Sequence, residues 1–135
     1  MLLTKKSEYA LLSLVIIAQS KNPQNVDQLS TDLNISKSFL AKILQNLAKN
    51  GILNSYKGNN GGFTLNKPYD KLTILEITKI AEQKYPAVFD CTTPNGMCHG
   101  SVHGKCTIFP LLSNLQLKIN DFLNQLTLKD IIEVE

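Results

Sequence analysis

The feature that most constrains this chain is the stretch 26–65, in which two short amphipathic helices run directly into a glycine-rich hairpin pattern. The apolar residues of the first part recur at three- and four-residue steps, as they do on one face of a helix. Asn25 can cap this helix, and Gln28 stands where the second half of a capping box is needed. Ser36 suits the N-cap of the second helix, and Gly51 its left-handed C-cap. A helix-turn-helix is therefore predicted.

The outer face of the second helix carries lysine, serine and amide side chains and no acid. Such a face suits a major groove, where lysine meets phosphate or guanine and an amide pairs with adenine. An ordinary amphipathic helix pair with solvated lysines would show the same periodicity. The residues expected to face the groove are Lys37, Ser38, Lys42, Gln45 and Asn46.

The hairpin that follows favours the DNA-binding interpretation. Residues 53–57 and 63–65 have the character of two short strands, and the glycines between them permit the positive backbone angles of a tight connection. Two helices, a turn and a hairpin make a winged helix-turn-helix. We expect Lys57, Asn59 and Asn60 of the wing to lie on phosphate or in the adjacent minor groove.

Charge is distributed unevenly along the chain. Residues 1–68 hold eight lysines against three acids, a balance of +5, whereas residues 69–135 hold six lysines against eight acids, a balance of −2. The basic half is the half with the recognition pattern, as a nucleic-acid footprint requires. All fourteen basic residues are lysines, so phosphate contacts and amides must replace the bidentate guanine contacts of arginine. A genome of low GC content would produce the same bias.

A helix expected over residues 5–20 is apolar on almost every side, which is typical of a helix buried at the centre of a domain. Its apolar run is too short to cross a bilayer, and the order of charge before it is the reverse of a signal peptide's, so we expect a cytoplasmic protein without a membrane partner. Glu8 lies one turn into this helix. From the residues alone, its simplest role is a carboxylate that stabilises the helix N-terminus.

Residues 85–106 form a long segment with no usable periodicity, rich in proline, glycine, serine and threonine. Irregular stretches of this length in a compact protein are functional or disordered. The segment contains all three cysteines of the chain, Cys91, Cys98 and Cys106. Three thiols in a cytoplasmic protein do not suit paired disulfides, and their spacing is too wide for a zinc ribbon.

Two kinds of metal site remain compatible with this segment. Widely spaced thiolates suit an iron–sulfur cluster, which takes soft ligands. A cluster wants four ligands, and the candidates for the fourth are His99, His103 and a carboxylate from elsewhere such as Glu8. A zinc site of Cys98, His103, Cys106 and one further ligand is the poorer alternative because of its spacing.

The cleanest helical pattern runs from residue 106 to residue 126, where apolar residues alternate four- and three-residue steps as in the seam of a coiled coil. The other helices are needed for the DNA-reading domain, so we expect a homodimer through this helix. Two-fold symmetry would place two recognition helices on successive major-groove faces. The seam residues are Ile108, Leu112, Leu115, Ile119, Phe122 and Leu126.

Several of these motifs together resemble the Rrf2 family of winged-helix bacterial regulators, over nearly the whole chain. The motifs are TKKSEYAL at 4–11, SFLAKILQNLAKNGIL at 38–53, KGNNGGFTL at 57–65 and the cysteine segment directly before a long helix. The hairpin and the cysteine segment are the most specific of them.

The resemblance implies that Cys91, Cys98 and Cys106 hold a two-iron or four-iron cluster whose state controls binding to promoter DNA. In some cluster-bearing members the fourth ligand is a carboxylate from the first helix of the other subunit, and Glu8 occupies the matching position. In other members it is a histidine three residues after the last cysteine, where this chain has Phe109. The resemblance therefore favours Glu8 of the partner chain as the ligand.

The expected fold class is mainly α, a winged helix-turn-helix with a small β-hairpin wing plus a long C-terminal dimerisation helix. We divide the chain into a DNA-binding domain at 1–83, a sensor loop at 84–106, and the dimerisation helix with its tail at 107–135. The expected function is that of a dimeric, sequence-specific transcription regulator, a repressor, whose cluster senses nitric oxide, redox or iron–sulfur status.

Two alternatives differ from this in their chemistry. A metal-free regulator could sense oxidants through bare thiols, and an iron–sulfur electron carrier could use the same scaffold without binding DNA. An enzyme is not expected, because the chain shows no nucleophile–base pair, and residues 58–62 lack the lysine and hydroxyl residue of a phosphate-binding loop.

Overall fold

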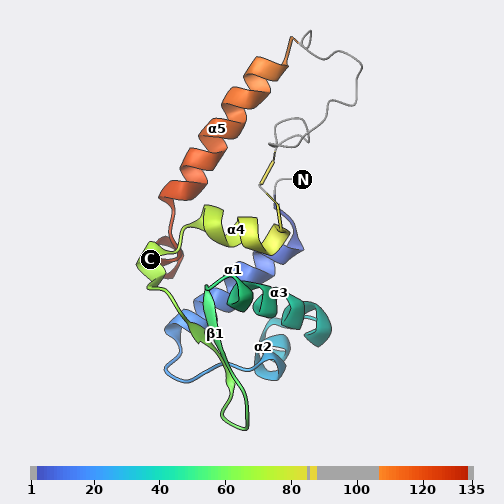
Figure 1. Cartoon of the computed structure of the whole chain (residues 1–135), viewed down its shortest axis with the longest axis vertical. Helices are drawn as coiled ribbons and strands as arrows, with labels where there is room; N and C mark the ends of the chain where they lie inside the picture. Colours follow the sequence, from blue (N-terminus) through green and yellow to red (C-terminus); the bar gives the residue numbers. More distant parts are fainter. Residues whose placement is uncertain (1–2, 85, 88–106, 134–135) are drawn as a thin grey trace.

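A computed structural model describes residues 3–84, 86–87 and 107–133 of the chain (Figure 1). It is mainly helical with one two-stranded antiparallel hairpin, which confirms the expected fold class. In chain order the elements are α1 (Lys5–Gln19), α2 (Val26–Leu33), α3 (Lys37–Lys49), β1 (Leu53–Tyr56), β2 (Gly62–Leu65), the 3-10 helix η1 (Tyr69–Lys71), α4 (Ile74–Glu82), α5 (Phe109–Gln125) and α6 (Leu128–Ile132).

Polar caps set where the helices begin. The Asn25 side chain accepts a hydrogen bond from the Gln28 backbone N–H at 2.7 Å, as predicted. The predicted return bond of the capping box, from the Asn25 N–H to the Gln28 side-chain oxygen, is not formed, and the Gln28 amide nitrogen donates to Asp32 at 2.9 Å. A complete capping box occurs at α6, where Thr127 and Asp130 satisfy each other's backbone N–H groups.

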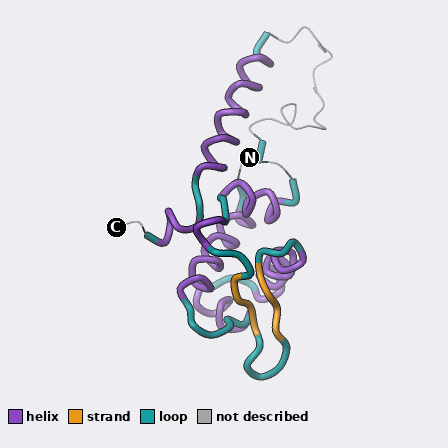
Figure 2. The backbone as a smooth tube through the Cα atoms, turned by 60° about the vertical axis from the view of Figure 1, so that its left-hand side comes forward, coloured by secondary structure: helices purple, strands orange, loops and turns teal. Residues whose placement is uncertain are grey.

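The core lies around α1, which α3, α4, α6 and the hairpin surround (Figures 1 and 2). This confirms the central position predicted for the first helix. Burial of each large aliphatic side chain contributes about 1.5–3 kcal/mol, so this cluster holds the elements together. Its members with no exposed surface are Ala10, Leu14, Leu29, Leu40, Leu44, Leu47, Ile52, Leu72, Ile77 and Leu128.

The hairpin is fixed to the domain by a further backbone pairing. β1 and β2 pair in antiparallel register from Leu53 opposite Leu65 to Tyr56 opposite Gly62. The chain before α2 then pairs with β2, because Gln24 and Phe63 exchange two backbone hydrogen bonds of 3.1 and 2.8 Å. The base of the wing is thus a rigid part of the domain.

The C-terminal end of the described chain returns to this same core. Backbone hydrogen bonds of 2.8 Å join the Ile74 N–H to the Leu126 carbonyl and the Leu128 N–H to the Leu72 carbonyl. Leu128 is fully buried beside them. The short helix α6 therefore packs on α1 and η1 of the N-terminal part of the chain, while the three-part division of the chain stays a prediction.

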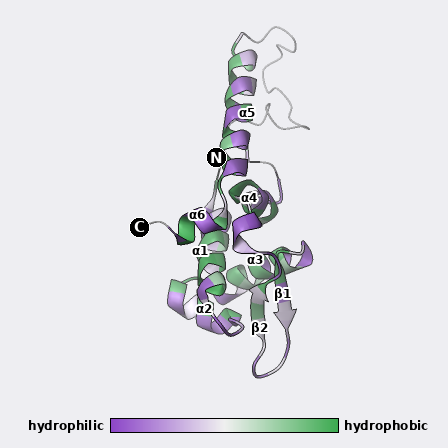
Figure 3. Ribbon diagram, turned by 90° about the vertical axis from the view of Figure 1, so that its left-hand side faces the viewer, coloured by the Kyte–Doolittle hydropathy of each residue, from purple (hydrophilic) through white to green (hydrophobic). Residues whose placement is uncertain are grey.

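Helix α5 begins at Phe109, three residues later than the predicted pattern, and its N-terminal end extends beyond α4 as an arm (Figure 1). Figure 3 shows apolar and polar residues alternating along it. Within the described residues, no helix is long and apolar enough to cross a membrane.

The predicted seam of α5 is divided between two faces. Leu112 is buried in its own chain, and Ile119 and Leu126 are half-buried against the same core. Because α4 of the same chain also packs against α5, the expectation that all six seam residues meet a partner helix stays a prediction. The other side is exposed, and its members are Ile108, Leu111, Leu115 and Phe122.

Candidate nucleic-acid interface and sensor residues

The recognition helix α3 presents one polar face to solvent. The turn before it is possible because Asn34 adopts the left-handed conformation at φ 55°, and Ser36 caps the helix N-terminus through the Phe39 N–H. Its apolar face is buried at Leu40, Ile43, Leu44 and Leu47. Four of the five predicted groove-facing residues are exposed, namely Lys37, Ser38, Lys42 and Gln45.

The charges on this face are not all equally available. The Lys37 ammonium forms an exposed ion pair with Asp27 of α2 at 2.6 Å. Lys42 has no carboxylate partner in the part of the chain that the structure describes. Since an exposed ion pair contributes only about 0–1 kcal/mol, phosphate can displace Asp27, but Lys42 needs no such exchange.

Asn46 does not lie on the groove-facing side. Its side-chain amide is half-buried and donates a hydrogen bond of 2.8 Å to the Ile80 carbonyl of α4. The prediction that Asn46 faces the major groove therefore conflicts with this geometry. The reason is local, since Asn46 lies at the edge of the buried face of α3, where α4 packs.

The wing tip carries the three residues predicted for it. Lys57, Asn59 and Asn60 are all exposed there. The connection closes through a hydrogen bond of 3.0 Å from the Gly61 N–H to the Gly58 carbonyl. The sequence analysis did not single out Tyr56, which is 52% exposed on β1 next to Lys57. A tyrosine hydroxyl is a suitable phosphate donor, and an aromatic residue beside a lysine in the hairpin was the available signal.

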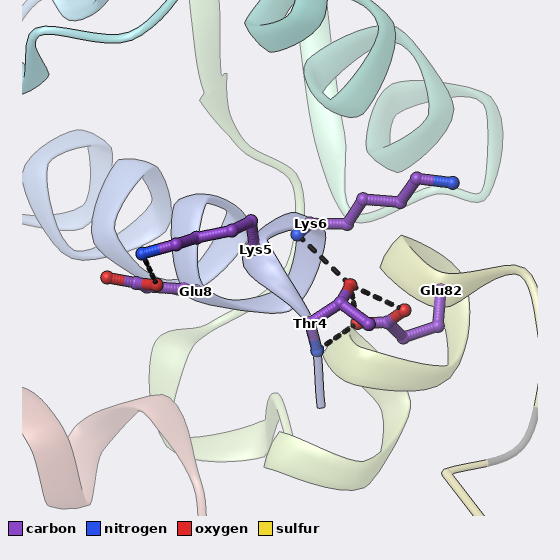
Figure 4. Close-up of polar contacts among 5 residues, drawn as sticks. All are labelled: Thr4, Lys5, Lys6, Glu8 and Glu82. Atoms are coloured by element: carbon purple, nitrogen blue, oxygen red, sulfur yellow. Dashed lines mark hydrogen bonds and ion pairs between the residues drawn. The ribbon is translucent and has the colours of Figure 1, made fainter. Parts of the chain in front are cut away.

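Glu8 lies on the exposed side of α1. Its carboxylate pairs with Lys5 at 3.0 Å, and this hydrogen bond together with the charge of Glu8 raises the pKa of Lys5 (Figure 4). The Glu8 side chain is about half exposed, so it can reach a group outside its own chain once Lys5 is displaced. The predicted role as a ligand stays a prediction.

The sequence analysis missed Glu82, at the last position of α4. It is the one buried charged side chain in the described ranges. It accepts hydrogen bonds from the Thr4 N–H at 2.9 Å (Figure 4) and from the Ser7 hydroxyl at 2.6 Å. Burial raises the pKa of Glu82, but the bonds from Ser7 and Thr4 outweigh it and leave the pKa below the ordinary value. No local sequence pattern marks this contact, because its partners lie 75 or more residues away.

The predicted sulfur and imidazole ligands, Cys91, Cys98, Cys106, His99 and His103, lie outside the described residues. Within those residues, no group of three or more metal-binding side chains comes together. The donor set itself has the four members that an iron–sulfur cluster takes, namely three soft thiols and one harder oxygen donor, the exposed carboxylate on α1.

Residues 3–134 match the family described as "Rrf2: Iron-dependent Transcriptional regulator". The chain belongs to the Rrf2 family. Among curated Rrf2-like relatives, a putative HTH-type transcriptional regulator of Aquifex aeolicus is 30% identical over 136 residues, covering 100% of this chain and 94% of that protein. The regulator IscR of Erwinia tasmaniensis is 29% identical, covering 98% of this chain and 79% of IscR.

Solved structures share the Rrf2 fold. CymR, described as the global cysteine regulator of B. subtilis, superimposes with a TM-score of 0.73 at 20% identity, covering 96% of this chain and 94% of CymR. IscR of T. potens gives a TM-score of 0.71 at 19% identity, covering 96% of this chain and 85% of IscR. As an Rrf2 protein the chain is a transcriptional regulator, and regulators of this kind are not enzymes.

Proposed function

We propose that this protein is a homodimeric regulator that binds promoter DNA through α3 and the wing, and that chemistry at Cys91, Cys98 and Cys106 sets its affinity for the operator. The observation that carries the proposal is the exposed basic and amide face of α3 beside the wing, in a chain that belongs to a family of transcriptional regulators. Repression is the expected direction.

The contacts divide into two kinds. Lys42 and Lys57 are exposed cations that suit phosphate, and Gln45 is an exposed amide that suits a base edge. Phosphate contacts release counterions, so the affinity must fall steeply as salt rises. An electron carrier on the same scaffold would bind DNA negligibly and without this salt dependence.

The exposed stripe of α5 supports a two-fold dimer. Ile108, Leu111, Leu115 and Phe122 are each at least 41% exposed and share one side of the helix. A second copy of the same stripe would cover them by isologous packing. Two recognition helices would then meet half-sites about 34–36 Å apart on one DNA duplex.

An iron–sulfur cluster is the sensor we favour. Cys91, Cys98 and Cys106 of one chain, with Glu8 of the partner chain, would supply its four ligands. When bound, the cluster would supply an iron centre reactive toward nitric oxide and oxygen. The ion pair between Lys5 and Glu8 is exposed on both sides and therefore weak, so it does not prevent Glu8 from turning to a ligand position.

A metal-free thiol sensor is the second candidate. It needs only the three thiols, so it is consistent with a Glu8 that stays paired with Lys5 in its own chain. In this case oxidation would join two of the three thiols or convert one to a mixed disulfide, and a disulfide reductant would reverse it.

The deciding experiment is an absorption spectrum with iron and sulfide assays on protein purified without oxygen. The wild type is compared with Glu8→Ala and with Glu76→Ala, a matched control whose carboxylate also pairs with a lysine, Lys67, at 2.7 Å. We expect visible bands with matched iron and sulfide, altered in Glu8→Ala only. A colourless, iron-free wild type whose thiols pair after mild peroxide would reject the cluster in favour of the thiol sensor.

A further inference from the structure

Asn46 joins the recognition helix to the end of α4. Its amide donates to the Ile80 carbonyl at 2.8 Å, and the Asn50 amide in turn donates to the Asn46 oxygen at 3.2 Å. The Ile80 carbonyl belongs to the last turn of α4, and the Gln83 N–H also donates to it at 3.2 Å. A displacement of this turn of α4 would therefore move the C-terminal half of α3 through the bond to Asn46.

The same turn of α4 is fastened to the start of α1. Glu82 accepts bonds from the Thr4 N–H and the Thr4 hydroxyl (Figure 4) and from the Ser7 hydroxyl, all between 2.6 and 2.9 Å. Ser7 is fully buried and Glu82 is 8% exposed. Breaking such a buried charged contact leaves its partners unsatisfied, so the turn and the N-terminus of α1 move together.

The chain leaves α4 at this point for the cysteine segment. Gln83 ends the helix in the left-handed conformation at φ 60°, and Pro86, three residues on, is fully buried. The Pro86 carbonyl accepts a hydrogen bond of 2.6 Å from Gln116 of α5. Polar contacts thus hold the entry to the cysteine segment to α1, to α5 and, through Ile80, to α3.

We propose that Asn46 is a positioning residue, which passes the state of the cysteine segment to the recognition helix through the last turn of α4. This rests on the proposed function, because it requires a sensor whose two states differ in DNA affinity. When the entry to the segment shifts with sensor state, the Ile80 carbonyl shifts with it, and the bond to Asn46 changes how α3 as a whole is held against the domain. A side chain that reads a base directly would instead affect both states alike.

The test measures the ratio of operator affinities between the two sensor states. The protein is prepared without oxygen in its loaded or reduced state and after nitric oxide or peroxide treatment, and fluorescence anisotropy is recorded on a duplex that the wild type selects from a random pool. Asn46→Ala is compared with Gln45→Ala, its exposed neighbour on α3. Thermal unfolding of each variant verifies that it is folded.

We expect a wild-type ratio of about 5 to 150. Asn46→Ala should bring this ratio about 2- to 30-fold closer to one, while Gln45→Ala should weaken binding in both states by the same factor and leave the ratio unchanged. A wild-type ratio above one that Asn46→Ala leaves unaltered would overturn this inference alone. A wild-type ratio of one would overturn the proposed sensing function and this inference with it.

A third variant, Asn50→Ala, shows whether the effect depends on the bond from Asn46 to Ile80 or on any change near the end of α3. Asn50→Ala removes the amide that contacts Asn46 but keeps the bond from Asn46 to Ile80. It should therefore retain the wild-type ratio. If Asn50→Ala brought the affinity ratio as close to one as Asn46→Ala does, the inference would be overturned. Any change at the C-terminal end of α3 would then have the same effect as losing the bond to Ile80.

Discussion

Single residues differ in how their charge is held. Glu82 is a buried carboxylate surrounded by donors, whereas Lys42 on the recognition helix is an exposed cation with no carboxylate partner in the described ranges. Glu82 contributes to folding, and Lys42 is available to a ligand. We therefore expect substitution of Glu82 to lower stability and substitution of Lys42 to change ligand binding.

Glu82 gives the stability of the protein an acid-side pH dependence. The pKa of Glu82 in the folded state lies below its ordinary value of 4.5, so its contribution is present above about pH 4.5 and is lost as pH falls through the lowered value. Glu82→Gln should lose about 1.5–3 kcal/mol of unfolding free energy at neutral pH, and less at acidic pH. Chemical denaturation between pH 3 and pH 7 measures this, with the exposed Glu133→Gln as control. Equal losses at every pH would contradict the assignment.

Lys42 predicts an electrostatic effect without a folding effect. Lys42→Ala should weaken binding to any duplex by a similar factor and lower the slope of log affinity against log salt by about 1. Anisotropy titrations at several salt concentrations measure the slope. Lys79→Ala on the exposed side of α4 is the control and should leave the slope unchanged. An unchanged slope in Lys42→Ala would place Lys42 away from DNA.

The sequence predicted the exposed residues of α3 better than it predicted their roles. Helical periodicity separates Leu44 from Gln45 because they lie on opposite faces. Periodicity does not predict the surroundings of Asn46, because this residue lies at the edge between the two faces. There the position of α4 decides whether the Asn46 amide is exposed or hydrogen-bonded. Periodicity could not find Glu82 either, since its partners Thr4 and Ser7 lie 75 or more residues earlier in the sequence.

Among the elements, α5 shows how a regular apolar pattern can serve two surfaces at once. Leu112 and Leu123 are buried against the chain itself, and Phe122, the neighbour of Leu123, is 61% exposed. The heptad pattern predicted the helix, but it could not show that α4 covers one side of the stripe. Adjacent positions on α5 therefore have separate energetic roles.

This division predicts opposite outcomes for two neighbouring substitutions. Phe122→Ser should shift the protein from dimer to monomer with little effect on the folding of each chain. Leu123→Ala should cost about 2–5 kcal/mol of unfolding free energy because it leaves a cavity in the core. Sedimentation equilibrium and denaturant unfolding distinguish the two. A Phe122→Ser protein that stays dimeric would reject the exposed stripe as the dimer surface.

The wing depends on a glycine that the sequence identified only as part of a flexible turn. Gly62 has φ 143°, and a Cβ there would lie 2.6 Å from the backbone carbonyl of Gln24. The glycine therefore permits the close approach between β2 and the segment before α2. Periodicity predicted the hairpin, but this third backbone partner was not predicted because it lies before the recognition helices in the chain.

Gly62→Ala should destabilise the protein by about 1 kcal/mol or more and weaken DNA binding through the displaced wing. Gly58→Ala is the matched control, since it also has positive φ, at 100°, but a Cβ there meets nothing within 4 Å. Both variants carry the backbone strain, and only Gly62→Ala carries the clash. Thermal unfolding that shows equal losses for the two would contradict the importance of the Gln24 contact.

At the scale of the whole molecule, the DNA-reading elements and the free end of α5 lie at opposite ends of the long axis (Figures 1 and 2). In the proposed dimer through α5, this separation would leave the wing and α3 unobstructed. The fold class and this order of elements were predictable, because each follows from local pattern. The return of α6 to the core was not, because it depends on packing between distant parts of the chain.

The arrangement predicts how the protein meets its operator. Two chains should bind one duplex whose half-sites are related by two-fold symmetry and centred about 34–36 Å apart. Inserting five base pairs between the half-sites should abolish cooperative binding, because it turns one site to the opposite side of the duplex, and inserting ten should restore part of it. Binding of a single chain per operator with full affinity would contradict the dimer.

The return of α6 also bears on how the protein is made. Of the fully buried core residues described, Leu128 is the last to be synthesised, and its backbone pairs with Leu72 near the middle of the chain. Domains fold from the N-terminus during synthesis, but this core lacks one of its members until translation has passed α5. A ribosome that stalls before α6 would therefore hold a chain with an open apolar site, which proteases and chaperones recognise.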